Sequence, residues 1–322
     1  MHPNRREPTI SRVDGTDRNE DVAAAGAREA VSPRLLGAVL LGLVGVSIFA
    51  ATPPATRLAV QVFDVWFVTF ARAAVATVPA AILLWITRQP IPPRRHWPRI
   101  AAISVLATVG YPGMLGLAME LAPATHAGVV LAILPVAMAI CAVLVAGERP
   151  SARFWALSVA GGVAVGTYTL IDSGGAFGLG DLWLLVAAFC AAMVYALSGA
   201  LARTMPGWAV ISWALLLAFP AMAVLTAVTF RPAYLAAPAD AWIAFAYLAL
   251  FSMFLGFFFW NRAMAIGGVA RIGQLQLLSP FVTFAVAAIL LGEDVTAKTI
   301  AFACLVVVIV FFAQRARVAR SD

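Results

Sequence analysis

The chain has 322 residues, of which 63% are hydrophobic and 11% are charged, and its mean hydropathy is +0.94. Soluble domains average about 45–50% apolar and about 25% charged residues, so this composition excludes an ordinary cytosolic enzyme and a disordered protein. The net charge of +7 does not indicate a nucleic-acid binder, because the basic residues lie beside apolar runs and not on a polar face. The predicted partner is a lipid bilayer.

Residues 1–33 are polar, rich in Arg, Asp and Ala, and without apolar periodicity. No apolar stretch follows a short basic start, so the segment does not resemble a signal peptide. The sequence predicts a disordered cytoplasmic tail at 1–33 and a short cytoplasmic tail at 315–322.

Ten apolar stretches follow the first tail, each near the length of about 20 residues that a helix needs to cross a bilayer. They cover residues 35–56, 65–86, 100–119, 126–146, 154–171, 181–201, 208–228, 241–261, 271–291 and 297–314. With the N-terminus in the cytoplasm, 18 Lys and Arg residues fall on cytoplasmic segments and 3 on outer connections. The positive-inside rule then predicts an all-α, multi-pass inner- or plasma-membrane protein with both termini cytoplasmic.

The second half of the sequence repeats part of the first at a constant offset of 145 residues. The matching positions are Ala118-Met119 with Ala263-Met264, Gly128 with Gly273, Pro135 with Pro280, and Gly147-Glu148 with Gly292-Glu293. We expect two five-helix repeats, 34–173 and 174–314. Because five is odd, the second copy would enter the membrane from the opposite side, as in many secondary transporters. The alternative is a duplicated membrane bundle without transport.

Four segments resemble the EamA-type transporters of the drug/metabolite transporter superfamily. They are LPVAMAICAVLVAGERPSARFWALSVAGG (134–162), LQLLSPFVTFAVAAILLGE (275–293), FVTFARAAVA (67–76) and GDLWLLVAAFCAAMVYALSGALAR (180–203). The resemblance covers about residues 34–313. It implies ten helices in inverted repeats, and movement of amino acids, related metabolites or toxic compounds, often outward.

Prolines mark three candidate hinges, Pro112, Pro135 and Pro280, since a proline inside a helix removes a backbone hydrogen bond. The spacing predicts that Pro135 and Pro280 lie in the middle of the fourth and ninth spans. The first span departs from the family, which often has a Trp-Gly pair there, because this chain has Pro53-Pro54 instead.

Candidate substrate-binding residues are polar groups deep in the spans, where they are costly and therefore informative. Arg72 lies about eight residues into the second span, roughly 12 Å deep at about 1.5 Å per residue. It is interpreted as an anion clamp or part of a gate, or else as a structural Arg that bonds carbonyls or reaches the membrane surface. In the ninth span, Gln276, Ser279 and Thr283 share one face, while Gln274 lies off that stripe. These side chains contact substrate or form interhelical hydrogen bonds.

Three further residues, Tyr111, Tyr195 and Ser198, are predicted to line a pocket, with core packing as the alternative. Glu120 and His126 flank the connection between the third and fourth spans and are candidate proton-coupling groups. A solvated loop is the alternative for that pair.

The rival functions are an intramembrane enzyme and a channel. The GLGD string at 178–181 matches a short motif of membrane aspartyl proteases, but no second carboxylate motif accompanies Asp181. No HExxH, GxSxG or P-loop string occurs, and no cofactor or metal is predicted. The sequence therefore favours a monomeric secondary transporter that exports small metabolites, amino acids or related compounds, by alternating access. The alternative substrates are drugs or toxic compounds.

Overall fold

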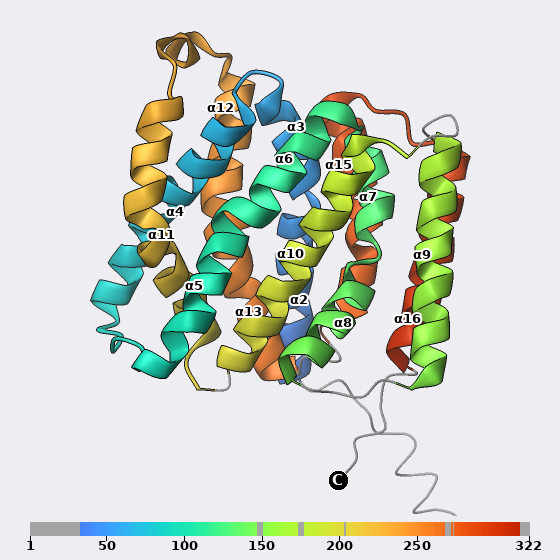
Figure 1. Cartoon of the computed structure of the whole chain (residues 1–322), viewed down its shortest axis with the longest axis horizontal. Coiled ribbons are helices and arrows are strands. Elements are labelled where there is room, and N and C mark those ends of the chain that lie inside the picture. Colours follow the sequence, from blue (N-terminus) through green and yellow to red (C-terminus); the bar gives the residue numbers. More distant parts are fainter. Residues whose placement is uncertain are drawn as a thin grey trace, which may run out of the picture.

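The computed structural model describes residues 33–146, 151–172, 177–202, 204–267, 272 and 274–315. The terminal tails expected at 1–33 and 315–322 lie outside this part of the chain except for Pro33 and Arg315, and so does Gly147-Glu148. The described residues form helices without strands (Figure 1). The first half contains α2 (Pro33–Ala50), α3 (Thr52–Val60), α4 (Val65–Ile86), η1 (Arg94–His96), α5 (Trp97–Val105), η2 (Leu106–Gly110), α6 (Tyr111–Leu121), α7 (Ala124–Leu131), α8 (Leu134–Ala146) and α9 (Ala152–Asp172). The second contains α10 (Leu179–Leu201), α11 (Gly207–Thr229), η3 (Pro232–Ala236), α12 (Ala239–Ala246), η4 (Tyr247–Leu255), α13 (Gly256–Gly267), η5 (Gln274–Leu278), α15 (Ser279–Leu291) and α16 (Ala297–Arg315).

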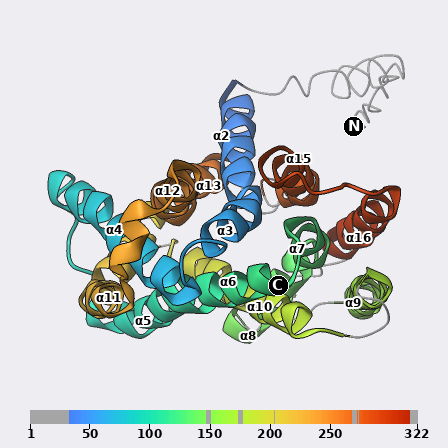
Figure 2. The ribbon, with the colours of Figure 1, turned by 90° about the horizontal axis from the view of Figure 1, so that it is seen from above.

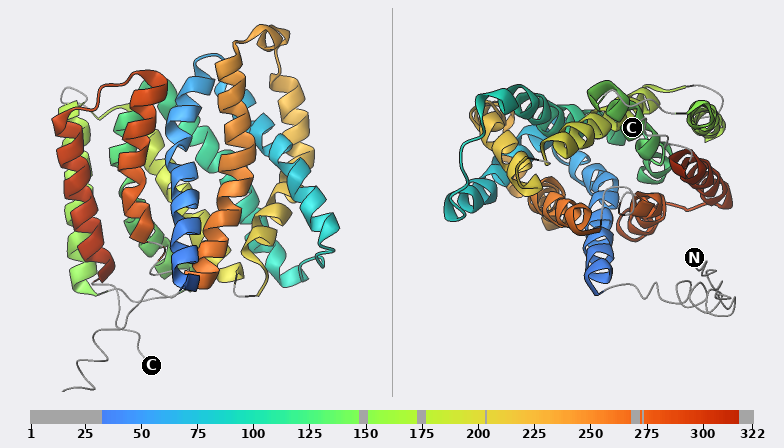
Figure 3. Two further views of the ribbon diagram at one scale, coloured as in Figure 1. Left: turned by 180° about the vertical axis from the view of Figure 1, so that it is seen from behind. Right: turned by 90° about the horizontal axis from the view of Figure 1, so that it is seen from below.

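Seven helical stretches among the described residues are long and apolar enough to cross a membrane. Two shorter apolar stretches, Leu275–Leu291 and Ala297–Phe312, correspond to the ninth and tenth predicted spans. The outer surface of the bundle exposes large apolar side chains, including Trp85 and Ile289 at 80% each, as expected of a surface that faces lipid. The start of α2 and the end of α16 lie at the same end of the bundle (Figures 1 and 3). We call the opposite end the distal end.

The fourth predicted span, 126–146, is not one continuous helix. It is divided into α7 and α8, which are separated at residues 132–133. In the ninth predicted span, residues Gln274–Leu278 form the 3-10 helix η5, and the α-helix α15 follows from Ser279. Pro135 and Pro280 therefore occupy the second position of α8 and α15, which corrects the expectation that they lie mid-helix. A proline is tolerated in the first turn of a helix, because the N–H that it lacks has no intrahelical partner there.

The third and eighth spans share another interruption. Each contains a π-helical segment near its centre, η2 before α6 and η4 before α13. Pro112 is the second residue of α6, immediately after η2. Extra residues in a π-helical turn shift the direction of the following side chains, and such turns are common at functional sites.

The first span is divided by its proline pair. Pro53 and Pro54 cannot donate hydrogen bonds to the carbonyl groups of Phe49 and Ala50, four residues earlier. The Thr283 hydroxyl of α15 donates to the Ala50 carbonyl oxygen at 2.7 Å. A side chain from the other half of the chain therefore satisfies a carbonyl that the proline leaves free.

Helices of the two halves pack against each other throughout the bundle. Figure 2 shows α9 paired with α16 at one edge and α4 with α11 at the other, while α13 packs on α2 and α15 on α7 between them. The α2–α13 pair is close because Gly45 has no side chain: a Cβ there would lie 3.2 Å from the Trp260 backbone. This packing brings the helix breaks and the π-helical and 3-10 segments of the two halves together near the centre of the bundle.

Candidate functional site

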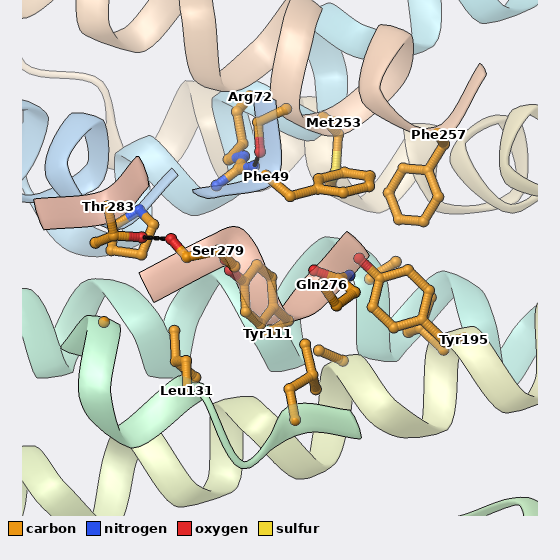
Figure 4. A pocket seen from close by; sticks show the side chains of 17 residues that line it. Phe49, Arg72, Tyr111, Leu131, Tyr195, Met253, Phe257, Gln276, Ser279 and Thr283 are labelled. Carbon is orange, nitrogen blue, oxygen red and sulfur yellow. Dashed lines mark hydrogen bonds between the residues drawn. The ribbon is translucent and has the colours of Figure 1, made fainter. Parts of the chain in front are cut away.

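A cavity of about 70 Å³ lies where the interrupted helices meet (Figure 4). By the usual criterion of about 10–15 Å³ for one water, it has room for several water molecules. Its lining comes from both halves and includes residues at or beside the α2–α3 break, η2, the α7–α8 break, η4 and η5. The seventeen lining residues are Phe49, Pro53, Arg72, Ala107, Tyr111, Gly128, Leu131, Leu134, Ala191, Val194, Tyr195, Ser252, Met253, Phe257, Gln276, Ser279 and Thr283.

Arg72 is the only charged residue of this lining and is 2% exposed. Its Nη2 donates to Ser252 Oγ at 3.1 Å, and Ser252 Oγ lies 2.8 Å from Thr52 Oγ1. Nε and Nη1 have no hydrogen-bond partner among the described residues. The side chain is therefore held inside the bundle, and the interpretation that it reaches out to the membrane surface is wrong.

The polar residues of the ninth span face the same cavity. Gln276 in η5 is buried and lies beside Tyr195 of α10, and Ser279 and Thr283 follow on α15 (Figure 4). The Thr283 hydroxyl is within reach of two carbonyl oxygens, 2.7 Å from Ala50 and 3.0 Å from Ser279. Thr283 is thus engaged with the backbone, whereas Gln276 presents an amide that can both donate and accept.

The rest of the lining is largely apolar. Phe49 makes edge-to-face contacts with Tyr195 and Phe257, with ring centroids 6.2 Å and 5.2 Å apart. Met253 and Leu131 line other parts of the wall (Figure 4). A solute in the cavity would meet a few polar groups within an apolar and aromatic enclosure, which is typical of small-molecule sites.

Six predicted substrate residues are brought together in this cavity: Arg72, Tyr111, Tyr195, Gln276, Ser279 and Thr283. Ser198 is buried but does not line the cavity, and the Gln274 side chain lies outside what the structure describes. The sequence reasoning missed Ser252 and the apolar wall. A small polar residue in an apolar span was the available signal for Ser252, whereas nothing local distinguishes Phe49 or Met253 from lipid-facing residues.

A second polar group lies at the distal end, and we call it the distal ionic cluster: Arg57, His126, Asp172, Asp181, Glu293 and Lys298. Three of its ion pairs join the first half of the chain to the second. Arg57 Nε lies 3.2 Å from Glu293 Oε1, His126 Nε2 lies 2.6 Å from Asp181 Oδ1, and Lys298 Nζ lies 2.6 Å from Asp172 Oδ1.

His126 is 4% exposed at its side chain and also places Nδ1 at 2.9 Å from Asp172 Oδ2. Both ring nitrogens therefore lie within hydrogen-bond distance of carboxylate oxygens. Glu293 accepts from the backbone N–H groups of Ala124 and Thr125 at 2.9 and 2.8 Å, at the positive N-terminus of α7. Glu120 is exposed and is not part of this cluster, and the role of Glu120 or His126 in proton coupling stays a prediction.

Comparisons with known proteins agree with the division of the chain into two halves. Residues 36–170 and 178–314 each match the EamA-like transporter family. The chain is 40% identical over 274 residues to the uncharacterized transporter YdeK of Bacillus subtilis (strain 168), covering 85% of this chain and 96% of that protein. It is also similar to a protein of known crystal structure, with 20% identity, a TM-score of 0.53, and coverage of 87% of this chain and 95% of the other. At 20% identity, this last likeness shows the fold alone.

Proposed function

Since the chain belongs to the EamA-like transporter family, we propose that it is a secondary transporter that moves small metabolites, amino acids or related compounds, out of the cell by alternating access. The observation that carries the proposal is the central cavity. Both halves of the chain line it, at the positions where their helices are interrupted. Transporter sites characteristically lie at the interface of two repeats and are built from discontinuous helices.

We further propose ten crossings arranged as two inverted five-helix repeats, with both termini in the cytoplasm. The 145-residue offset supports this arrangement, because it relates the start of α8 to the start of α15. The Lys and Arg distribution supports the orientation. The outward direction of transport rests on the resemblance of the motifs to their family.

The distal ionic cluster indicates which contacts would break during the conformational change of alternating access. Three of its ion pairs cross between the halves, so the distal end opens only when these three separate. We propose that the structure represents the state closed at this end. Rocking of one half against the other would break these pairs and expose the central cavity on the distal side.

Export of drugs or toxic compounds is the second candidate. The observation that favours it is the apolar and aromatic part of the lining, contributed by residues such as Phe49, Met253 and Phe257. No part of either proposal requires catalysis or a cofactor.

The proposal is tested by counterflow in proteoliposomes, with a panel of amino acids and apolar drugs, with and without a proton gradient. A carrier shows saturable counterflow, whereas a channel shows none. Gln276→Ala removes an uncharged hydrogen-bonding group from the cavity and should raise the KM by about three- to tenfold. The control is Gln61→Ala, at an exposed position after α3, which should leave the KM unchanged.

Absence of saturable counterflow for every solute would refute transport by a carrier. An unchanged KM and rate in a folded Gln276→Ala protein would remove Gln276 from the site while leaving the carrier proposal intact.

A further inference from the structure

Arg72 has donors that no described residue uses. Its guanidinium carries five N–H bonds, and one of its nitrogens donates to Ser252, while Nε and Nη1 are buried without a partner among the described residues. At least about 90% of buried polar groups in proteins have a hydrogen-bond partner, so an exception at a cavity wall indicates a place for a ligand acceptor or an ordered water. Figure 4 shows the guanidinium at the edge of the cavity.

The charge of the cavity indicates that the hydrogen-bond acceptor of the ligand is an anion. None of its seventeen lining residues is acidic, and Arg72 forms no ion pair with any described residue. An uncompensated cation in surroundings of low dielectric constant is costly, and an anion that enters the cavity would relieve that cost. A cationic solute would be repelled by the same charge.

The arrangement around the guanidinium favours a planar anion. Ser252, which is itself bonded to Thr52, holds one nitrogen and so restricts the orientation of the plane. Arginine binds carboxylates through two parallel N–H···O bonds, a geometry that the ammonium of a lysine cannot reproduce. Phe49 and Met253 line the same cavity as the guanidinium and could contact an apolar body attached to the anion (Figure 4).

We propose that the transported solute is an organic carboxylate with a small apolar body, and that Arg72 binds its carboxylate through N–H groups that no described residue accepts from. This inference rests on the proposed function and names the chemical group that the same cavity recognises. Gln276 and the Tyr195 hydroxyl remain to bond a further polar group of the solute. Amines and other cations without a carboxylate are excluded.

The test compares two matched series of probes. The first comprises L-leucine, 4-methylpentanoate, L-leucinamide and 3-methylbutylamine, and the second comprises L-alanine, propanoate, L-alaninamide and ethylamine. The thermal stability of the purified full-length protein is measured with each probe, because a ligand that binds only the folded state raises the Tm. The carboxylates of at least one series should raise the Tm and compete in counterflow, whereas the corresponding amide and amine should do neither.

Two substitutions test Arg72 itself. In Arg72→Gln the affinity for the carboxylate should fall at least about tenfold, the loss expected for a hydrogen bond between charged groups. Arg72→Lys keeps the charge and should lose part of the affinity while still rejecting the amine. The matched control is Arg231→Gln, at an exposed position before η3, which should bind as the unaltered protein does.

A purely structural role would show a different pattern. Substitution would then lower the Tm of the ligand-free protein without changing the preference for carboxylates. If Arg72→Gln does not fold, both quantities can still be measured on Arg72→Lys. The proposal is overturned if no carboxylate of either series binds, if amides or amines bind as well as acids, or if Arg72→Lys binds carboxylates with unchanged affinity. Counterflow without a preference for carboxylates overturns the proposed role of Arg72 but leaves the carrier function intact. A carboxylate-dependent shift in Tm without counterflow overturns the carrier function but leaves the binding site at Arg72 intact.

Discussion

Thr283 illustrates at the scale of one residue how a helix break is stabilised. Polar side chains inside a membrane are expected to have partners, and its partner is a carbonyl group that a proline in another helix has freed. The sequence places Thr283 on a polar stripe and Pro54 in an apolar span, but only the packing of α15 against α3 brings the two segments together.

Thr283→Val should lower the free energy of unfolding by about 1–2 kcal/mol, because the Ala50 carbonyl loses its side-chain donor in a buried position. Reversible unfolding in mixed micelles measures the change. The control is Thr229→Val, which removes the hydroxyl of a half-buried residue near the end of α11, bonded in the described structure to carbonyls of its own helix, and should cost less than about 0.5 kcal/mol. Equal effects of the two substitutions would contradict a specific bond between Thr283 and Ala50.

At the scale of elements, α7 is held by charges at its N-terminus. Glu293 accepts from its first two backbone N–H groups, and His126, in its first turn, joins it to α9 and α10. Since α8 begins after a break, α7 is a half-helix that can move independently of α8. The ionic contacts therefore fix the position of a segment that also lines the cavity through Gly128 and Leu131.

His126→Ala should destabilise the protein by about 3 kcal/mol, because the Asp181 carboxylate, which is 3% exposed, loses the ring nitrogen that lies 2.6 Å from it. It should also accelerate hydrogen exchange of the α7 backbone, measured by mass spectrometry, because the distal end opens more readily. Lys298→Met is the control, since Lys298 is 40% exposed and its ion pair is worth less than about 1 kcal/mol. Unchanged exchange in α7 of the His126→Ala protein would show that the cluster does not close this end.

At the scale of the whole molecule, the start of α2 and the end of α16 lie at one end of the bundle (Figures 1 and 3). The connection between α4 and α5 lies at that end as well, and the start of α10 lies at the distal end (Figure 1). Among the described residues, Arg88, Arg94 and Arg95 belong to this connection between α4 and α5. Placing that end in the cytoplasm gives both halves of the chain a consistent orientation.

Reporter fusions within 90–95 and within 174–178 should therefore report opposite sides of the membrane. A reporter at the C-terminus should report the same side as the first fusion, the cytoplasm, and serves as the control for orientation. Alkaline phosphatase and a fluorescent protein provide complementary readouts, because each is active on one side only. Fusions at 90–95 and 174–178 that report the same side would contradict the ten-crossing, inverted arrangement.

The sequence by itself determined the membrane character, the family and the two-part division. These follow from local and repeated signals, because a bilayer demands long apolar helices and a duplication preserves its spacing. It also selected most of the polar residues of the cavity, since a polar group deep in an apolar span stands out wherever the span packs. The positions of the helix breaks were harder to predict from the sequence. Pro135 and Pro280 indicate that a helix is interrupted nearby, but they do not show that the α-helix begins just before each proline.

Only the tertiary structure decided which residues share a site. Arg72 and Ser252 are 180 positions apart, and the three ion pairs that cross between the halves join residues separated by 55 to 236 positions. Such pairings depend on how interrupted helices pack, and no local periodicity encodes them. The same packing left two Arg72 nitrogens without a partner in the described part of the chain, the feature from which we infer a carboxylate-binding cavity.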